Sequence, residues 1–200
     1  MIRKIERVFL IAVFLIIGVC SYAQSGAYGA YSPYSIYGIG EISKQGTAYN
    51  KSMGGVGIAS RNKRFINYLN PAAVTARDTL SFMADFGLSE KNTAFAQDGV
   101  RSAKNTFNMY NFVMSFPIYR SSAFMVGITP FSDVGYDFSS IEKRDEIIGN
   151  TGNITYDSYG TGSVYQIFAS AGATFWKSFS VGAEVLFLFG TLDKVTNMNF

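Results

Sequence analysis

Residues Asn108–Phe131 read NMYNFVMSFPIYRSSAFMVGITPF, two strand-like segments joined by a turn too short for anything but an antiparallel hairpin. In the first segment alternate residues are apolar, namely Tyr110, Phe112, Met114, Phe116 and Ile118, and the other face carries Asn111, Val113, Ser115 and Pro117. In the second segment Phe124, Val126, Ile128 and Pro130 share one face. Each segment has about ten residues, the length with which a tilted strand crosses a bilayer. The stretch predicts a hairpin of a transmembrane antiparallel β-barrel in an outer membrane.

Three further segments alternate in the same way, at residues 79–89, 164–175 and 181–189. If the apolar faces contact lipid, the opposite faces line the barrel interior, and these inward positions are both polar and apolar. We predict that the lumen lining includes Met83, Met125, Phe131, Phe168 and Glu184. A water-filled pore would be more uniformly polar, so the mixed lining indicates a lumen that holds a plug or a hydrophobic ligand.

The connections between these segments alternate in length. Glu90–Thr106, Ser139–Ser163 and the residues after Gly190 are expected to be long loops, whereas Tyr119–Ser122 and Trp176–Phe179 are short turns. Outer-membrane barrels place short turns in the periplasm and long loops outside, so this alternation sets the orientation. About five strands cannot close a membrane barrel, and we therefore expect residues 79–200 to be the first strands of a larger barrel that is incomplete in this chain.

Residues 1–23 have the pattern of a secretory signal peptide. Arg3, Lys4 and Arg7 precede an apolar run, Val8–Val19, that is too short to be a membrane-spanning helix. Cys20 leaves a lipid-modified signal as an alternative, although Val19 stands where such signals usually carry a small residue. Without these residues the net charge falls from +3 to about +1 and no cysteine is left. The expected location is the outer membrane of a Gram-negative bacterium.

Residues 24–78 have neither strand nor helix periodicity over a useful length and need another surface to pack on. Gly55-x-Gly57-x-x-Ser60 approaches a dinucleotide fingerprint, but the preceding residues 46–52 are polar rather than a buried strand, so we reject a nucleotide site. The glycines instead allow close backbone packing. Asn70 followed by Pro71 predicts a helix start, with asparagine as the N-cap.

The sequence contains few candidates for catalytic or ligand-binding residues. It contains no histidine, so neither Ser/His nor Cys/His catalysis is available, and we expect no enzyme activity and no cofactor. The near-neutral charge gives no nucleic-acid footprint. Glu142, Asp145 and Glu146 with Lys143 and Arg144 could hold a divalent ion or bind lipopolysaccharide, but such a mixed cluster is usually a solvated loop, and no metal site is predicted.

Pro130 and Gly135 interrupt the predicted strand pattern, because proline lacks the N–H that a β-ladder needs. Unpaired backbone in lipid survives only beside protein or a cavity, so the break predicts a lateral opening. The alternative is that the strand has already spanned the bilayer here and the break lies at the outer rim.

Three stretches in order resemble the start of FadL/TodX-type outer-membrane transporters, in the variety found in Bacteroidetes-like envelopes. They are Ser32–Gly40, Met53–Ala59 and Asn67–Ala73, and the resemblance covers about residues 32–136. It implies a fourteen-stranded barrel whose N-terminal part, residues 24–78, forms a hatch. It places Gly54, Gly55, Gly57, Asn70, Pro71 and Ala72 in the hatch motif, and it associates a kink in the third strand with sideways exit.

The resemblance implies passive, cofactor-free uptake of hydrophobic compounds such as long-chain fatty acids. The second hypothesis is a plugged barrel that acts as a structural or interaction subunit of an outer-membrane assembly or secretion complex. A third is a secreted soluble β-sandwich. The expected partners are membrane lipid or lipopolysaccharide, hydrophobic small molecules and other outer-membrane proteins.

Overall fold

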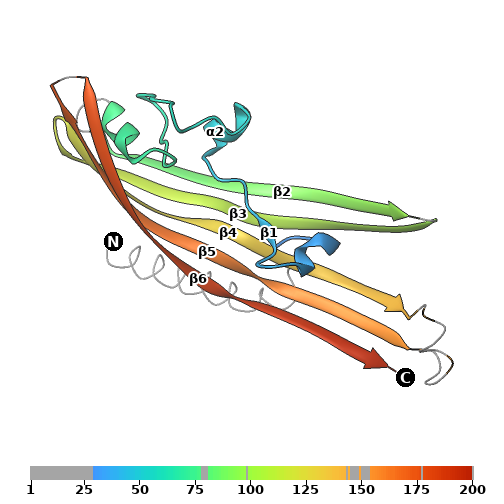
Figure 1. Cartoon of the computed structure of the whole chain (residues 1–200). Coiled ribbons are helices and arrows are strands. Elements are labelled where there is room, and N and C mark those ends of the chain that lie inside the picture. Colours follow the sequence, from blue (N-terminus) through green and yellow to red (C-terminus); the bar gives the residue numbers. More distant parts are fainter. Residues whose placement is uncertain are drawn as a thin grey trace, which may run out of the picture.

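The computed structural model describes residues 29–77, 81–97, 99–142, 144, 149, 154–176 and 178–199. Its main feature is one antiparallel sheet in which five long strands lie in chain order, β2-β3-β4-β5-β6 (Figure 1). The strands are β2 (Met83–Gln97), β3 (Val100–Tyr119), β4 (Ser122–Ile141), β5 (Thr155–Phe175) and β6 (Phe179–Asn199), and a short β1 (Glu41–Ile42) pairs with β4. The chain is therefore all-β with little helix, and its described strands form an open sheet rather than a closed barrel.

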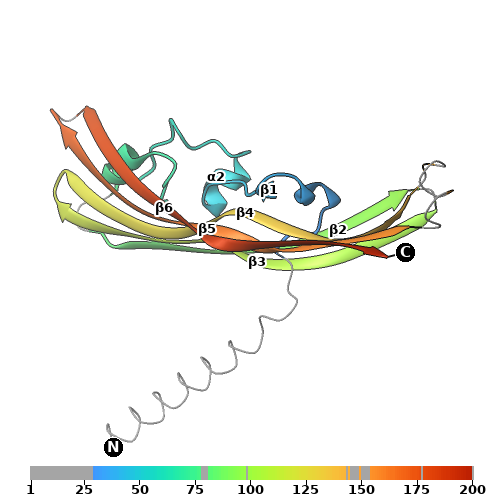
Figure 2. The same ribbon diagram turned by 60° about the horizontal axis from the view of Figure 1, so that its bottom comes forward.

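Residues 29–77 cover the concave side of this curved sheet, as the turned view shows (Figure 2). We call residues 29–43 the strap and residues 44–77 the inner segment. The strap contains the 3₁₀ turn η1 (Pro33–Ile36), and the inner segment contains the helix α2 (Ala48–Ser52) and the 3₁₀ helix η2 (Pro71–Ala76). The helix start predicted from the sequence at Asn70 is confirmed, since its side chain accepts a 3.0 Å hydrogen bond from the backbone N–H of Ala72.

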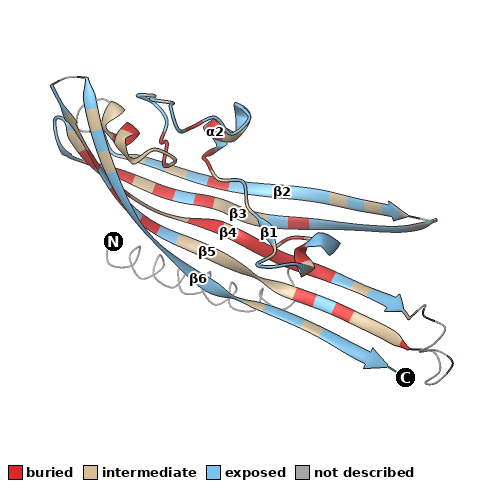
Figure 3. Cartoon of the chain, viewed as in Figure 1, coloured by how far each residue is buried: buried red, intermediate tan, exposed pale blue. Residues whose placement is uncertain are grey.

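The core lies between the inner segment and the concave face of the sheet, and its positions on the strands lie in the half next to the tight turns (Figure 3). It consists of Ile66, Tyr68, Val74, Val113, Ala123, Met125 and Phe168. The Tyr68 ring stacks on the Phe168 ring with 5.3 Å between centroids. The convex face instead exposes large apolar side chains, including Phe86, Phe116 and Phe187. No second sheet or helix covers them in the described residues.

One predicted outward residue lies on the other face. The pairing of β2 and β3 shifts between Gly87 and Leu88, opposite Tyr110, so β3 carries a bulge at this point. The bulge reverses the alternation, and the Tyr110 ring faces Lys51 of the inner segment, 3.7 Å from its ammonium group. The assignment of Tyr110 to the lipid-facing side was wrong because a regular period of two cannot anticipate an extra residue.

The strands are longer than the sequence indicated. The expected loop Glu90–Thr106 is wrong, because β2 and β3 pair through Gln97↔Val100. Likewise β4 and β5 pair out to Ile141↔Thr155, and β6 continues beyond Gly190 to pair along β5 as far as Asn199. These regions are polar on both faces, so they lack the hydrophobic alternation on which strand prediction relies, although backbone pairing needs none. The two short turns, by contrast, are confirmed.

A search of the described residues for helices finds none with the length and apolar character needed to cross a membrane.

Candidate functional site: a seam between two strands

The sheet is continuous except at one place, a seam between β3 and β4 (Figure 1). β4 and β5 pair along the whole length of β4, from Ser122↔Ala173 to Ile141↔Thr155. β3 and β4 pair only next to their tight turn, from Tyr119↔Ser122 to Phe112↔Ile128. Beyond Ile128 the β2–β3 hairpin diverges from β4. The seam therefore separates a β3 edge at residues 100–111 from a β4 edge at residues 129–141.

The two residues predicted to break the strand lie on this seam. Pairing with β3 ends just before Pro130, and the register against β5 also shifts between Pro130 and Ser132. Gly135 is buried, and its backbone bonds to the strap twice. Its N–H donates to Ser35 Oγ at 3.1 Å, and its carbonyl accepts the Ser32 N–H at 2.8 Å. The use of this place as an exit for hydrophobic compounds stays a prediction.

The strap covers part of the β4 edge by adding backbone bonds. β1 pairs antiparallel with β4 through Glu41↔Asp133 and Ile42↔Ser132, and the Ser43 N–H donates to the Phe131 carbonyl at 2.9 Å. The strap thus supplies a short substitute for the missing part of β3, and it satisfies edge groups that would otherwise lack partners.

On the other side of the seam the strap is held by side chains. Asn108 donates to the Gly29 carbonyl, and the Tyr31 and Ser102 hydroxyls share a hydrogen bond. Lys91 of β2 pairs with Glu41 at 3.1 Å, with about half of each side chain exposed. Among the described residues no backbone ladder joins the strap to β3. The strap is therefore attached more firmly to β4 than to the hairpin.

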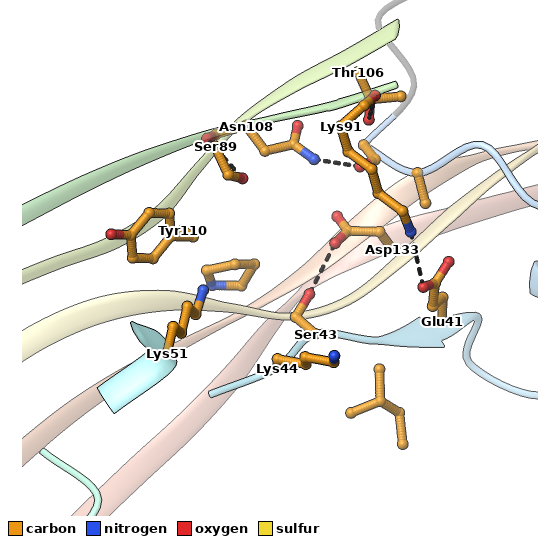
Figure 4. A pocket seen from close by; sticks show the side chains of 14 residues that line it. Glu41, Ser43, Lys44, Lys51, Ser89, Lys91, Thr106, Asn108, Tyr110 and Asp133 are labelled. Carbon is orange, nitrogen blue, oxygen red and sulfur yellow. Dashed lines mark hydrogen bonds and ion pairs between the residues drawn. The ribbon is translucent and has the colours of Figure 1, made fainter. Parts of the chain in front are cut away.

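A cavity of about 430 Å³ lies in the seam, between the strap, the β2–β3 hairpin and β4 (Figure 4). Lys44, Lys51 and Lys91 line it together with the carboxylates of Glu41 and Asp133. Asp133 accepts hydrogen bonds from Ser43 at 2.9 Å and Ser163 at 2.7 Å. Burial lowers the pKa of Lys51 from its usual value, and the ammonium group lies over the Tyr110 ring.

Gln45, at the junction of strap and inner segment, links both to the wall of the sheet. Its side-chain N–H donates to the Pro130 carbonyl at 2.9 Å, and its oxygen accepts from Gln166 at 3.1 Å and from the Tyr68 hydroxyl at 3.4 Å. The Tyr68 hydroxyl also accepts the Gly46 N–H. Burial raises the pKa of Tyr68 to about 12; the Gly46 bond opposes this, and the charges of Asp85 and Glu184 add to it.

Glycines of the sheet let η2 approach the wall next to the tight turns. Gly172 and Gly182 are register partners on β5 and β6. A Cβ on Gly182 would clash with the backbone of Pro71 and Ala72, and one on Gly172 would come within 2.7 Å of the Pro71 carbonyl oxygen. The close packing was predicted for Gly54, Gly55 and Gly57, but the approach of η2 to the wall depends on these two glycines of the sheet.

The glycines of the predicted hatch motif have different surroundings. Gly54 and Gly55 adopt positive φ angles of 76° and 88° in a turn after α2, with open space around them. Gly57 lies against Leu69, Asn50 and Asn67.

The predicted lumen residues also separate into groups. Met125 and Phe168 belong to the core, and Met83 packs against it. Phe131 is partly buried at the seam, and Glu184 is exposed on β6.

Sequence reasoning missed an amide network that gives the inner segment its shape. Asn67 donates to the carbonyls of Gly57 and Ser60, and Asn50 donates to the Val56 carbonyl at 3.0 Å. Asn50 also completes a capping box with Thr47 at the start of α2. The spacing Thr47-x-x-Asn50 was the available signal, and it resembles the usual Ser/Thr-x-x-Glu/Gln box closely enough to have located α2.

The acidic loop contributes no metal site in the described residues, where no group of three potential ligands comes together. Glu142 pairs with Arg144 at 2.8 Å, and hydrogen bonding to Glu142 raises the pKa of Arg144. Lys143, Asp145 and Glu146 lie outside the described residues, as do residues 1–28 with the predicted signal peptide.

Comparison with known proteins assigns the family. A family model described as BamG matches residues 1–199. The chain belongs to the BamG family. Membership associates it with the outer membrane of Gram-negative bacteria and with other outer-membrane proteins. No curated protein and no solved structure matches the chain.

The resemblance to FadL/TodX transporters was therefore wrong, since the match over residues 1–199 is to the BamG family. The resemblance rested on three features: a glycine-rich stretch, the Asn70-Pro71-Ala72 helix start and aromatic strands. These features suit any curved sheet that packs an N-terminal segment on its concave face. They therefore do not distinguish the two families. Uptake of hydrophobic compounds rested on that resemblance and loses its support with it.

Proposed function

We propose that this protein is a structural and interaction subunit of the outer-membrane assembly (BAM) complex, anchored in the membrane by the strands of a barrel and plugged by its own N-terminal residues. Family membership supports association with that complex. The anchoring and the plug are supported by how apolar and polar side chains are distributed over the sheet.

The outward face changes character along the strands. On β6 the outward face exposes Val185, Phe187 and Phe189 in the half next to the tight turn, whereas in the far half it carries Thr191, Asp193 and Asn197. Strands of about 20 residues are roughly twice as long as a tilted strand needs to cross a bilayer. We therefore place the half with the tight turns, the near half, in the membrane, and the half that contains the seam, the far half, beyond its outer surface.

The observation that carries the scaffold function is the filled concave face of β3, β4 and β5 next to the tight turns. Val113 and Met125 are 0% exposed and Phe168 is 1% exposed, because the inner segment covers them. A conduit needs free space behind its wall, whereas a scaffold can be packed solid. The mixed polar and apolar lining noted in the sequence is explained by this packing without any ligand. Lipid, lipopolysaccharide and hydrophobic small molecules stay predicted partners.

The test is affinity purification of the full tagged chain from outer membranes in mild detergent. We expect subunits of the assembly complex to copurify in fixed ratio and to migrate with the chain as one species. The control is an unrelated tagged barrel protein from the same membranes, which should bring down none of them at that ratio. Isolation of the chain alone, from a preparation in which the complex is otherwise intact, would contradict the proposal.

A further inference from the structure

We propose that the seam is a strand-acceptor site, in which the β4 edge at residues 129–141 pairs with an extended polypeptide strand of a partner protein when the strap is displaced. This rests on the proposed function only for the source of the partner, an outer-membrane assembly protein or its client. The pairing mode itself follows from the two strand edges.

The first argument is unused pairing capacity. The strap forms ladder pairs only at Ser132 and Asp133, with flanking bonds at Phe131 and Gly135. Toward the seam, residues 137–141 make no backbone bond to any described residue, although the same residues pair fully with β5 on their other side. An exposed edge with free N–H and C=O groups is a template for a further strand.

The second argument is that the strap does not fill the space between β4 and the β2–β3 hairpin. The cavity of about 430 Å³ lies between the strap and the hairpin, at the place where β3 would otherwise pair. Tyr34 and Tyr37 of the strap are 77% and 75% exposed, so two of its three tyrosines bury little aromatic surface. Displacing it would cost a few backbone bonds and side-chain contacts that an incoming strand replaces in kind.

The third argument concerns charge. Glu41 of the strap brings a carboxylate to Lys91, and Lys44 and Lys51 line the same cavity. Removing the strap would leave Lys91 without that partner. The strand that fits is therefore one with an acidic residue at the position of Glu41.

The experiment locks the strap covalently. Ile42 and Ser132 are register partners, so the I42C/S132C variant can form a disulfide across β1 and β4. The only native cysteine, Cys20, lies in the predicted signal peptide. The probe is a fluorescent synthetic peptide, GAYSPYSIYGIGEIS, which copies residues 29–43, and its binding to the purified full chain is followed by anisotropy. The matched control lock, A169C/V185C, joins register partners of β5 and β6 in the half next to the tight turns, away from the strap.

We expect saturable binding to the reduced I42C/S132C chain and to the control in both redox states, and binding weakened about tenfold or more in the oxidised I42C/S132C chain. A peptide with lysine in place of Glu41 should bind more weakly than the original. Absence of binding to the reduced chain, or binding that the lock leaves unchanged, would overturn the inference.

Three further outcomes show which molecule occupies the site and which of the two proposals fails. A dimer formed by exchange of straps, detected by sedimentation, would show that a second copy rather than a partner protein takes the site, and would overturn the inference. Loss of peptide binding with copurification intact would overturn the acceptor site alone. Peptide binding without copurification of the assembly complex would instead contradict the proposed function.

Discussion

The near and far halves of the sheet hold the N-terminal residues by different forces. In the near half an apolar core joins the inner segment to the wall, with Tyr68 stacked on Phe168. In the far half the strap is held by backbone bonds to β4 and by partly exposed polar side chains such as Glu41 and Lys91. Buried apolar area contributes far more to stability than exposed ion pairs do. The inner segment of the near half is therefore expected to stay packed on the sheet, whereas the strap of the far half can be displaced at a lower cost.

The largest effect is expected from a core substitution in the near half. Phe168→Ala removes a fully buried ring and leaves a cavity against Tyr68, at a cost of about 3–5 kcal/mol in the free energy of unfolding. The measurement is denaturant unfolding of the purified chain in detergent. The matched control is Phe187→Ala, since Phe187 is 67% exposed and its loss opens no cavity. Equal losses for the two variants would show that the inner segment is not packed on the wall as described.

The next effect is a loss of stability at alkaline pH through Tyr68. Its pKa is about 12 in the folded chain and about 10 in the unfolded chain, so below pH 10 both states keep the proton and the stabilisation is complete. As the pH rises from 10 to 12 the unfolded state loses its proton first, and stability falls by about 2–3 kcal/mol in all. The difference between the wild-type and Tyr68→Phe unfolding curves isolates this residue from other tyrosines. Parallel curves across this pH range would contradict the buried position of the hydroxyl.

A smaller loss is expected where η2 meets the wall. Gly182→Val would push a side chain into the backbone of Pro71 and Ala72, and overpacking of this kind costs about 1–3 kcal/mol. Faster proteolysis within residues 44–77 measures the detachment of the inner segment. Ala183→Val is the control, because it adds a similar branched side chain at the exposed neighbouring position. If both variants resist the protease as well as the wild type does, η2 does not depend on this close approach.

The sequence predicted the strands and turns of the near half but almost none of the structure of the far half. Alternation at Phe112–Ile118 and Phe124–Ile128 reflects an apolar outer face on one side and packing against the inner segment on the other, so it indicated the strands, the two tight turns and the concave positions Met125 and Phe168. In the far half apolar residues such as Val134 and Tyr136 are few and do not alternate over a long stretch, and the strands there are set by backbone pairing that any residue can make. Long loops were therefore expected where β2 to β6 in fact continue.

The seam could be foreseen only in part. Pro130 indicated a break because it lacks an N–H, and pairing between β3 and β4 does end just before it. What fills the break could not be inferred, because the strap contacts β4 through main-chain groups and through the side chains of Ser35 and Ser43, and serines in a loop are not distinctive. The bulge at Tyr110, which turns that ring toward Lys51, has no signature in the local alternation either.

The smallest effect, and the sharpest probe of the difference between the halves, is expected from Glu41→Gln. About half of each side chain in the Glu41–Lys91 pair is exposed, so its loss should cost less than about 1 kcal/mol and leave the unfolding curve almost unchanged. Amide exchange at Ser32 and Ser43 should nevertheless speed up, since these N–H groups bond to β4 and become available when the strap lifts. Because an exposed pair is screened by salt, the variant and the wild type should converge at about 1 M ionic strength. Glu90→Gln is the control, as Glu90 bonds to Asn105 within the hairpin and does not touch the strap. Global unfolding of the Glu41 variant on the scale of Phe168→Ala would mean that strap and core form one cooperative unit, and the far half could not then open while the near half stays closed.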